Sequence, residues 1–242
     1  MEKNISYFFI GFIVFSMLPF ASAHAFDIKE LCKYKEFTCY RVKKGDTWEK
    51  HWPNSEQREM VMRLNRTNLP LNSHTWIVVP KNLAELSPLD LAPFPSHRNT
   101  GGQKLVLVDL NKLAYGAYDQ NGQLVRWGPA SGGRDYCEDI DEPCSTPAGN
   151  YAITVKKGAD CFSTAFPVDT EGGAPMPYCM FFHEGYALHG ANYFPSYNAS
   201  HGCVHLYNED AQWLNEQFTD IGTKVTIIND QDDNENATDS GQ

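Results

Sequence analysis

The chain has 242 residues, a formal net charge of -10 and 42% hydrophobic residues, which suffices for one sizeable core and a smaller unit beside it. An acidic chain without a basic patch is excluded from the nucleic-acid-binding class. The chain has seven cysteines, and whether they are paired depends on whether the protein is exported. Disulfides persist in exported proteins and are rare in the cytosol.

The N-terminus predicts export. Lys3 precedes a mostly apolar run over residues 5–20, and small residues with an Ala-x-Ala pattern follow. This order is typical of a secretory signal peptide, which we place at residues 1–25 with cleavage after Ala23 or Ala25. The apolar run is short for a membrane helix, so we expect no stable membrane span after its removal.

The cysteine count is odd, so at least one thiol is unpaired or pairs outside the chain. Six cysteines allow fifteen pairings, and the sequence alone does not choose among them. Three pairs close in sequence suggest themselves: Cys32 with Cys39, Cys137 with Cys144, and Cys161 with Cys179. Cys203 is then the remainder.

After an N-terminal segment (residues 26–39), residues 40–85 predict a small βααβ unit. A strand at 40–42 leads to a turn at Gly45 and a helix capped by Asp46 or Thr47; a second helix begins with Ser55 as its cap. Residues 74–80 are rich in Trp, Ile and Val and predict the closing strand.

This unit resembles a LysM module, a small peptidoglycan-binding domain. The resemblance rests on Tyr-x-Val-x-x-Gly-Asp-Thr from Tyr40, a central Asn65 and a closing apolar-apolar-Pro. Trp48 stands where the family has an aliphatic residue, and the usual glycine before the last strand is missing. The resemblance implies glycan binding; the alternative is a spacer that binds nothing.

Residues 86–102 are proline-rich, end in two glycines and predict an extended linker. Beyond it the chain is strand-rich up to residue 229. Apolar runs at 104–110 and 114–119 and an Asn121-Gly122 hairpin signal are followed by further strands at 123–133, 145–155, 178–190 and 222–229. One helix is expected at 208–218, with Asn208 as its cap. The acidic tail, residues 230–242, has too little apolar content to fold.

Nucleophilic chemistry is the third possibility for Cys203, beside a disulfide and a metal ligand. A cysteine nucleophile needs a base and donors for an oxyanion. His189 lies fourteen residues earlier at the end of a predicted strand, and Gly190 and Gly202 let backbone approach a ligand closely. The amides of Gly202 and Cys203 are the expected oxyanion donors.

Residues 103–229 resemble an L,D-transpeptidase catalytic domain of the YkuD type. The pattern is His189-Gly190, a spacer, and then a Ser-His-Gly-Cys string ending at Cys203. Supporting strings are Thr-Pro-x-Gly from Thr146 and Met-Pro-Tyr ending at Tyr178. The resemblance implies a mostly β, sandwich- or barrel-like domain with one helix.

The resemblance also implies a mechanism. Cys203 attacks the carbonyl that precedes the terminal D-alanine of a stem tetrapeptide, while His189, held by the Gly190 carbonyl, accepts its proton. A thioester forms, and an amine of another stem peptide or of an outer-membrane lipoprotein lysine then attacks it. Further implications are a periplasmic location, acylation by carbapenems and no cofactor or metal. Residues expected to contact substrate are Ser200, His201, Tyr178 and His205.

His205 departs from the family, which usually has Arg or Asn at this position. A histidine is only partly charged at neutral pH, so the departure puts donor or acceptor preference in question. The segment between Cys161 and Cys179 is Gly- and Pro-rich, and we interpret it as a lid over the cleft.

Other functions stay open at this point. The same thioester chemistry with water gives an L,D-carboxypeptidase or another hydrolase, and a wall-binding protein would need no chemistry. A papain-like peptidase is disfavoured because its cysteine precedes its histidine along the chain. Zinc is the metal alternative, and its candidate ligands are His201, Cys203 and His205, with His183 or His189.

Overall fold

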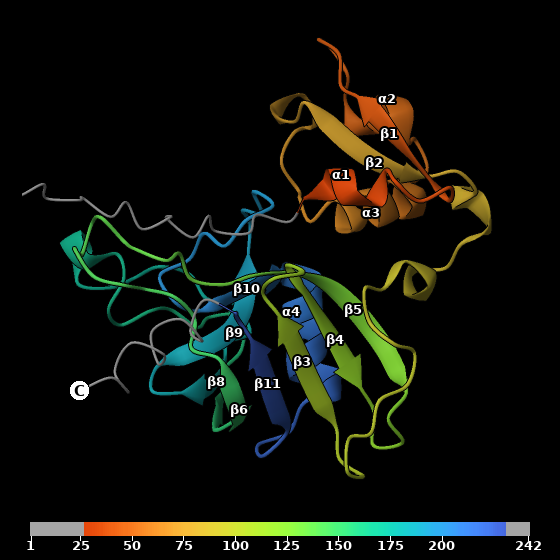
Figure 1. The fold of residues 1–242 in the computed structure, drawn as a ribbon. Coiled ribbons are helices and arrows are strands. Elements are labelled where there is room, and N and C mark those ends of the chain that lie inside the picture. The colour runs from red at the N-terminus through yellow and green to blue at the C-terminus, as the bar shows by residue number, and fades with distance from the viewer. Residues whose placement is uncertain (1–26, 231–242) are drawn as a thin grey trace, which may run out of the picture.

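The computed structural model describes residues 27–230, so the predicted signal peptide and residues 231–242 of the predicted tail lie outside the described residues. Within this range, none of the helices is both long and apolar enough to cross a membrane. Figure 1 shows a small N-terminal unit, red to orange, above a larger β domain.

The N-terminal unit has the predicted order of strand, helix, helix, strand. The strands β1 (Phe37–Arg41) and β2 (Trp76–Pro80) pair antiparallel. The helices α2 (Trp48–His51) and α3 (Ser55–Leu64) lie between them in sequence, and α1 (Ile28–Leu31) precedes them. We call residues 27–85 the N-terminal module.

Two side-chain contacts hold the helices of the module to the rest of it. The Asn65 amide donates to the Val61 and Val78 carbonyls, at 2.6 and 2.8 Å, and accepts from the Val78 N–H. Trp48 is 5% exposed and donates from its indole to the Leu69 carbonyl, so this bulky residue is part of the module's core. Thr47 caps α2 as expected.

The larger β domain is built on one nine-stranded sheet in the order β6-β11-β3-β4-β5-β10-β9-β8-β7. Its strands are β3 (Leu105–Asp109), β4 (Ala114–Tyr118), β5 (Leu124–Ser131), β6 (Gly149–Ala152), β7 (Val155–Lys156), β8 (Met180–His183), β9 (Tyr186–Ala191), β10 (Val204–Tyr207) and β11 (Lys224–Ile228). The pairs β11–β3 and β10–β9 are parallel, and the others are antiparallel. The predicted hairpin at Asn121-Gly122 joins β4 to β5, with Gly122 at φ +79°.

The sheet curls until its two ends meet. Tyr151 of β6 stacks on His183 and lies 5.3 Å from the Phe182 ring, both on β8. Inside the curl, the helix α4 (Asn208–Trp213) and the π-helical turn η5 (Leu214–Phe218) bury Ala211, Leu214 and Phe218 against the sheet. The predicted mostly β architecture with one helix is confirmed.

Residues 86–102 lie against the sheet and join the two units into one core. Leu91 and Phe94 are buried in a cluster that runs from Trp48 of the module to Trp127 of β5. The Trp127 indole donates to the Pro88 carbonyl at 2.5 Å, and the Tyr118 hydroxyl to the Pro95 carbonyl at 2.9 Å. The short 3-10 helices of the chain are η1 (Leu71–Ser73), η2 (Leu83–Glu85), η3 (Pro88–Leu91) and η4 (Val168–Thr170).

Candidate active site

A cleft of about 740 Å³ opens along β9 and beside the start of β10. One wall carries Cys203, His189 and His205, and the opposite wall consists of residues 162–166 and 174–177. Pairing of β9 with β10 explains the first wall, because Val204 lies opposite Leu188 and His205 opposite His189. Residues distant in sequence therefore meet at one edge of the parallel pair.

Cys203 carries the free thiol of the described residues, since the three pairs that are close in sequence form disulfides. Its Sγ lies 3.9 Å from the Gly185 carbonyl and accepts a backbone hydrogen bond from Ala187, two residues before His189 on β9. Burial raises the pKa of the Cys203 thiol, and the Ala187 N–H opposes this rise.

His189 is 5% exposed, and its Nδ1 lies 2.9 Å from the Gly190 carbonyl. A carbonyl only accepts, so Nδ1 carries the hydrogen and Nε2 keeps a free lone pair. Burial lowers the pKa of His189 to about 4, against the opposing effect of the Gly190 carbonyl. At neutral pH the cleft therefore holds a neutral imidazole with an unprotonated nitrogen.

The loop before Cys203 is internally hydrogen-bonded. Ser200 is buried, and its Oγ accepts from the Gly202 N–H at 3.0 Å and donates to the Cys203 carbonyl at 2.5 Å. The Gly202 carbonyl accepts from the Thr146 hydroxyl at 2.6 Å. The expected oxyanion role of Gly202 therefore does not fit this geometry, because its N–H is already donated to Ser200.

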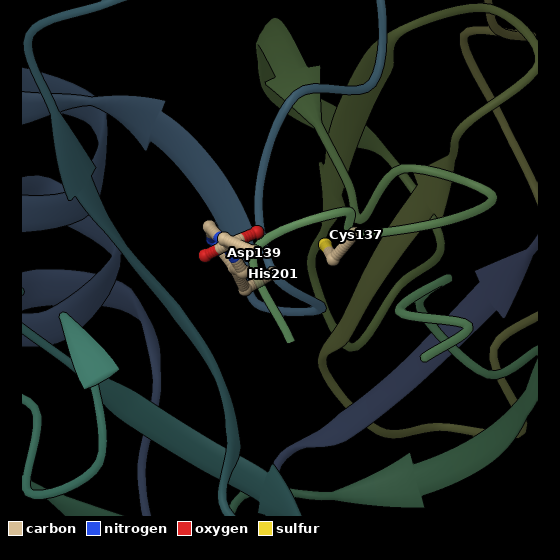
Figure 2. Close-up of side chains that lie close together, drawn as sticks. All are labelled: Cys137, Asp139 and His201. Carbon is tan, nitrogen blue, oxygen red and sulfur yellow. The ribbon is translucent and has the colours of Figure 1, made fainter. Parts of the chain in front are cut away.

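His201 lies at the mouth of the cleft and is held by a residue that the sequence did not single out. Its Nε2 lies 2.7 Å from the Asp139 carboxylate (Figure 2), and its ring centroid is 4.8 Å from that of Phe166. The hydrogen bond from His201 lowers the pKa of Asp139. Asp139 belongs to the loop closed by the Cys137–Cys144 disulfide, so this disulfide helps to place His201.

Cys137, Asp139 and His201 lie close together (Figure 2). Their potential metal-ligand atoms are within 4.8 Å of one another. Cys137 is bonded to Cys144, however, and a disulfide sulfur is not a thiolate ligand. The zinc site considered from the sequence used His201, Cys203 and His205 as ligands. The His201 ring is bonded to Asp139, whereas the His205 ring packs 4.9 Å from that of His189, so the two imidazoles belong to different groups of side chains.

Of the remaining predicted substrate contacts, His205 lines the cleft and Tyr178 does not. The His205 Nδ1 is buried without a hydrogen-bond partner among the described residues. Tyr178 has φ +59° and packs against the sheet core, while Asn215 donates to its carbonyl at 3.2 Å. The Tyr178 side chain therefore packs toward the core instead of the cleft.

The Cys161–Cys179 disulfide closes the loop that forms the second wall. Within it, Phe166 contacts His201, and Phe162 is 52% exposed. The loop therefore borders the cleft as the lid interpretation requires; its opening and closing stay a prediction.

Residues 103–227 match the family described as YkuD, the L,D-transpeptidase catalytic domain. The chain belongs to this family. An L,D-transpeptidase from Xylanimonas cellulosilytica DSM 15894 is 25% identical with a TM-score of 0.53, over 72% of this chain and 79% of that one. One from Stackebrandtia nassauensis is 23% identical (TM-score 0.45, 57% and 61% covered), as is L,D-transpeptidase 3 of Mycobacterium tuberculosis with a faropenem-derived adduct (0.43, 52% and 60%). Comparison with curated proteins gives no match.

Family membership confirms the resemblance and the mostly β catalytic fold drawn from the sequence. It assigns the domain to L,D-transpeptidase chemistry, which implies peptidoglycan substrates. The family match begins at residue 103, so it does not include the N-terminal module.

Proposed function

We propose that this protein is a periplasmic peptidoglycan L,D-transpeptidase that uses Cys203 as its nucleophile and His189 as its base. The proposal rests on the presence of a free thiol and an unprotonated imidazole nitrogen in the same cleft. A free thiol and a buried imidazole line the same cleft. The imidazole Nδ1–H is bonded to the Gly190 carbonyl, which leaves Nε2 to accept a proton.

In the first half-reaction, the Cys203 Sγ attacks the carbonyl carbon between the diamino acid and the terminal D-alanine of a stem tetrapeptide. The thiol proton passes to His189 Nε2. The tetrahedral intermediate then collapses, the C–N bond breaks, and His189 returns the proton to the leaving amine of D-alanine. The product is a thioester on Cys203.

In the second half-reaction, a primary amine attacks the thioester carbon and loses a proton to His189. The C–S bond breaks, and Sγ is reprotonated. The amine belongs to the side chain of another stem peptide or to a lysine of an outer-membrane lipoprotein. The LysM-like module is proposed to bind the glycan that carries the stems.

Mass spectrometry of purified disaccharide-tetrapeptides incubated with the protein tests this proposal. Crosslinked dimers that have lost one D-alanine are expected, and Cys203→Ala should give none. Tripeptides alone would identify a hydrolase. Absence of both products, together with no carbapenem adduct on Cys203, would indicate a wall-binding protein without this chemistry.

A further inference from the structure

A turn of the N-terminal module, which contains Thr67 and Asn68, is hydrogen-bonded to the loop between the two proposed catalytic residues. Residues 192–198 connect β9, which carries His189, to the Ser200–Cys203 string. The Asn68 side chain donates to the Asn192 carbonyl at 3.1 Å and accepts from the Phe194 N–H at 3.0 Å. One amide thus pairs with this backbone as a neighbouring strand would.

Further contacts fix the same stretch of the loop. The Thr67 hydroxyl donates to the Phe194 carbonyl at 2.8 Å, and Tyr207 of β10 donates to the Thr67 carbonyl at 2.7 Å. Ser196 donates to the Asn65 carbonyl at 3.0 Å. The Phe194 side chain is 1% exposed and meets the Tyr207 ring edge-on at 4.7 Å. The loop therefore has little freedom while the module is docked.

This loop is connected to the His189 imidazole by a series of contacts between residues that line the cleft. Asn192 accepts through Oδ1 from the Asn208 amide at 2.6 Å. Asn208 in turn packs on Gly190 so closely that a Cβ there would lie 2.4 Å from Asn208 Oδ1. Gly190 is the residue whose carbonyl holds His189 Nδ1 at 2.9 Å.

A second cavity, of about 290 Å³, shows that the module borders the active site. It is lined on the module side by Glu59, Met62 and Asn68. Its other side includes Asn192 and Asn208, which also line the catalytic cleft. The module therefore forms one wall of this second cavity, which shares Asn192 and Asn208 with the catalytic cleft.

We propose that the N-terminal module is part of the catalytic unit and that Asn68 is a positioning residue for His189, acting through Asn192 and Asn208. The inference rests on the pairing of His189 with Cys203 in the proposed function. A chain of contacts is not in itself energetic coupling, so the experiment measures coupling directly.

The experiment follows alkylation of Cys203 by iodoacetamide at pH 7 in the full chain, by intact mass. With three disulfides, one adduct reports on one thiol, and the absence of a second adduct shows that the disulfides are intact. Circular dichroism and the midpoint of a denaturant titration show that each variant is folded. The variants are Asn68→Ala, Asn68→Asp, His189→Ala and the double variant Asn68→Ala/His189→Ala. Asn82→Ala is the matched control, because this exposed asparagine of the module makes no side-chain cap.

We expect His189→Ala to set the slow limit, Asn68→Ala to be about tenfold slower than the wild type, and the double variant to match His189→Ala alone. Asn82→Ala should stay within twofold of the wild type. Asn68→Asp places a carboxylate against the Asn192 carbonyl, so it should be slow at pH 7; its rate relative to the wild type should recover as acid restores an O–H donor.

Each contrary outcome has its own meaning. If His189→Ala reacts as fast as the wild type, the pairing in the proposed function fails and this proposal with it. If His189→Ala is slow while Asn68→Ala is as fast as the wild type, only the positioning role is overturned. Additive slowing in the double variant would also overturn it, because Asn68 would then act on Cys203 by another route.

Discussion

At the scale of single residues, the cleft holds its reactive pair in the neutral form. Burial lowers the pKa of His189 to about 4 and raises the pKa of the Cys203 thiol. The pair therefore starts as thiol and imidazole, and the proton moves as the bond to substrate forms. This differs from a preformed thiolate–imidazolium pair, in which the proton has moved before substrate binds.

The rate constant for carbapenem acylation of Cys203 should be level between about pH 5 and pH 8. It should fall below pH 5 and halve near pH 4, because protonated His189 cannot accept the thiol proton. Intact-mass kinetics across this range measure it, with His189→Ala as the control that lacks the acidic limb. A tenfold fall for each unit from pH 8 to pH 5 would instead indicate that the reactive form is a thiolate produced by ionisation of Cys203 without help from His189.

His205 should recognise substrate without a charge. Burial, and then the positive charges that His189 and His201 would carry, lower the pKa of His205 to about 3, so it is neutral at pH 7. We expect His205→Asn to change the KM for the donor tetrapeptide less than about threefold, since loss of a charged hydrogen bond costs about 1.5–3 kcal/mol and would raise KM tenfold or more. His183→Asn, outside the cleft lining, is the control.

The sequence predicted the residues of the cleft that belong to one short string or precede a glycine. Cys203, His189 and His201 were found in this way. Asp139 and Asn68 carry no such signal, because each acts on a residue more than sixty positions away. Gly202 was assigned an oxyanion role from its position beside Cys203, and only the hydrogen bond to Ser200 shows that its N–H is engaged.

At the scale of elements, the disulfide loops determine the second wall of the cleft. Cys161 and Cys179 are buried and enclose the segment that carries Phe166. The Cys32–Cys39 loop belongs to the module, spans 7 residues against 18 and does not line the cleft. Removal of either disulfide should lower stability, but only removal of Cys161–Cys179 should also change the cleft.

The double variant Cys161→Ser/Cys179→Ser should lose about 3 kcal/mol of unfolding free energy, because a longer loop gains more chain entropy when it unfolds. It should also slow carbapenem acylation, since the wall loses its anchor. Cys32→Ser/Cys39→Ser should lose about 2 kcal/mol and leave acylation unchanged. Denaturant titration and intact-mass kinetics measure both effects. Equal acylation in the two double variants would contradict the lid interpretation.

Sequence patterns predicted most strands but not how they assemble. The apolar run of β3 is buried at all five positions, as expected for a strand covered on both faces. The helix caps were less predictable, because neighbouring polar residues compete. Asn54 caps α3 in place of Ser55, and the Asn208 amide donates to Asn192 while the helix begins after Tyr207. Strand order and curl depend on long-range pairing, which local patterns do not contain.

At the scale of the whole molecule, charged side chains hold the module on the sheet. Arg63 of α3 pairs with Asp210 of α4 at 2.5 Å, and the Asp210 side chain has no exposed surface. Arg126 of β5 binds the same carboxylate at 2.8 Å, and the Arg66 guanidinium lies 4.9 Å from the Trp127 ring centroid. In the sequence Arg63 resembles a solvent-facing helix residue, so the interface was not predicted and residues 86–102 were interpreted only as a linker.

The Arg63–Asp210 pair gives the last prediction. Arg63→Met keeps the length of the side chain but leaves a fully buried carboxylate with Arg126 alone, so we expect a loss of about 3 kcal/mol in unfolding free energy. Arg58→Met, on the same helix, removes a 3.9 Å pair with the exposed Glu49 and a hydrogen bond to the Trp52 carbonyl, and it should cost about 1 kcal/mol because no buried charge is left unpaired. Calorimetry and denaturant titration measure both.

A double variant distinguishes loss of the Arg63–Asp210 attraction from the cost of leaving the buried Asp210 carboxylate without that partner. Arg63→Met/Asp210→Leu should recover much of the stability lost in Arg63→Met, because it removes the buried carboxylate and lets the partly exposed Arg126 turn to solvent. The module would then stay docked through its apolar cluster with Trp127. If Arg63→Met instead costs no more than Arg58→Met, the ion pair does not anchor the module, and the docking depends on the apolar cluster alone.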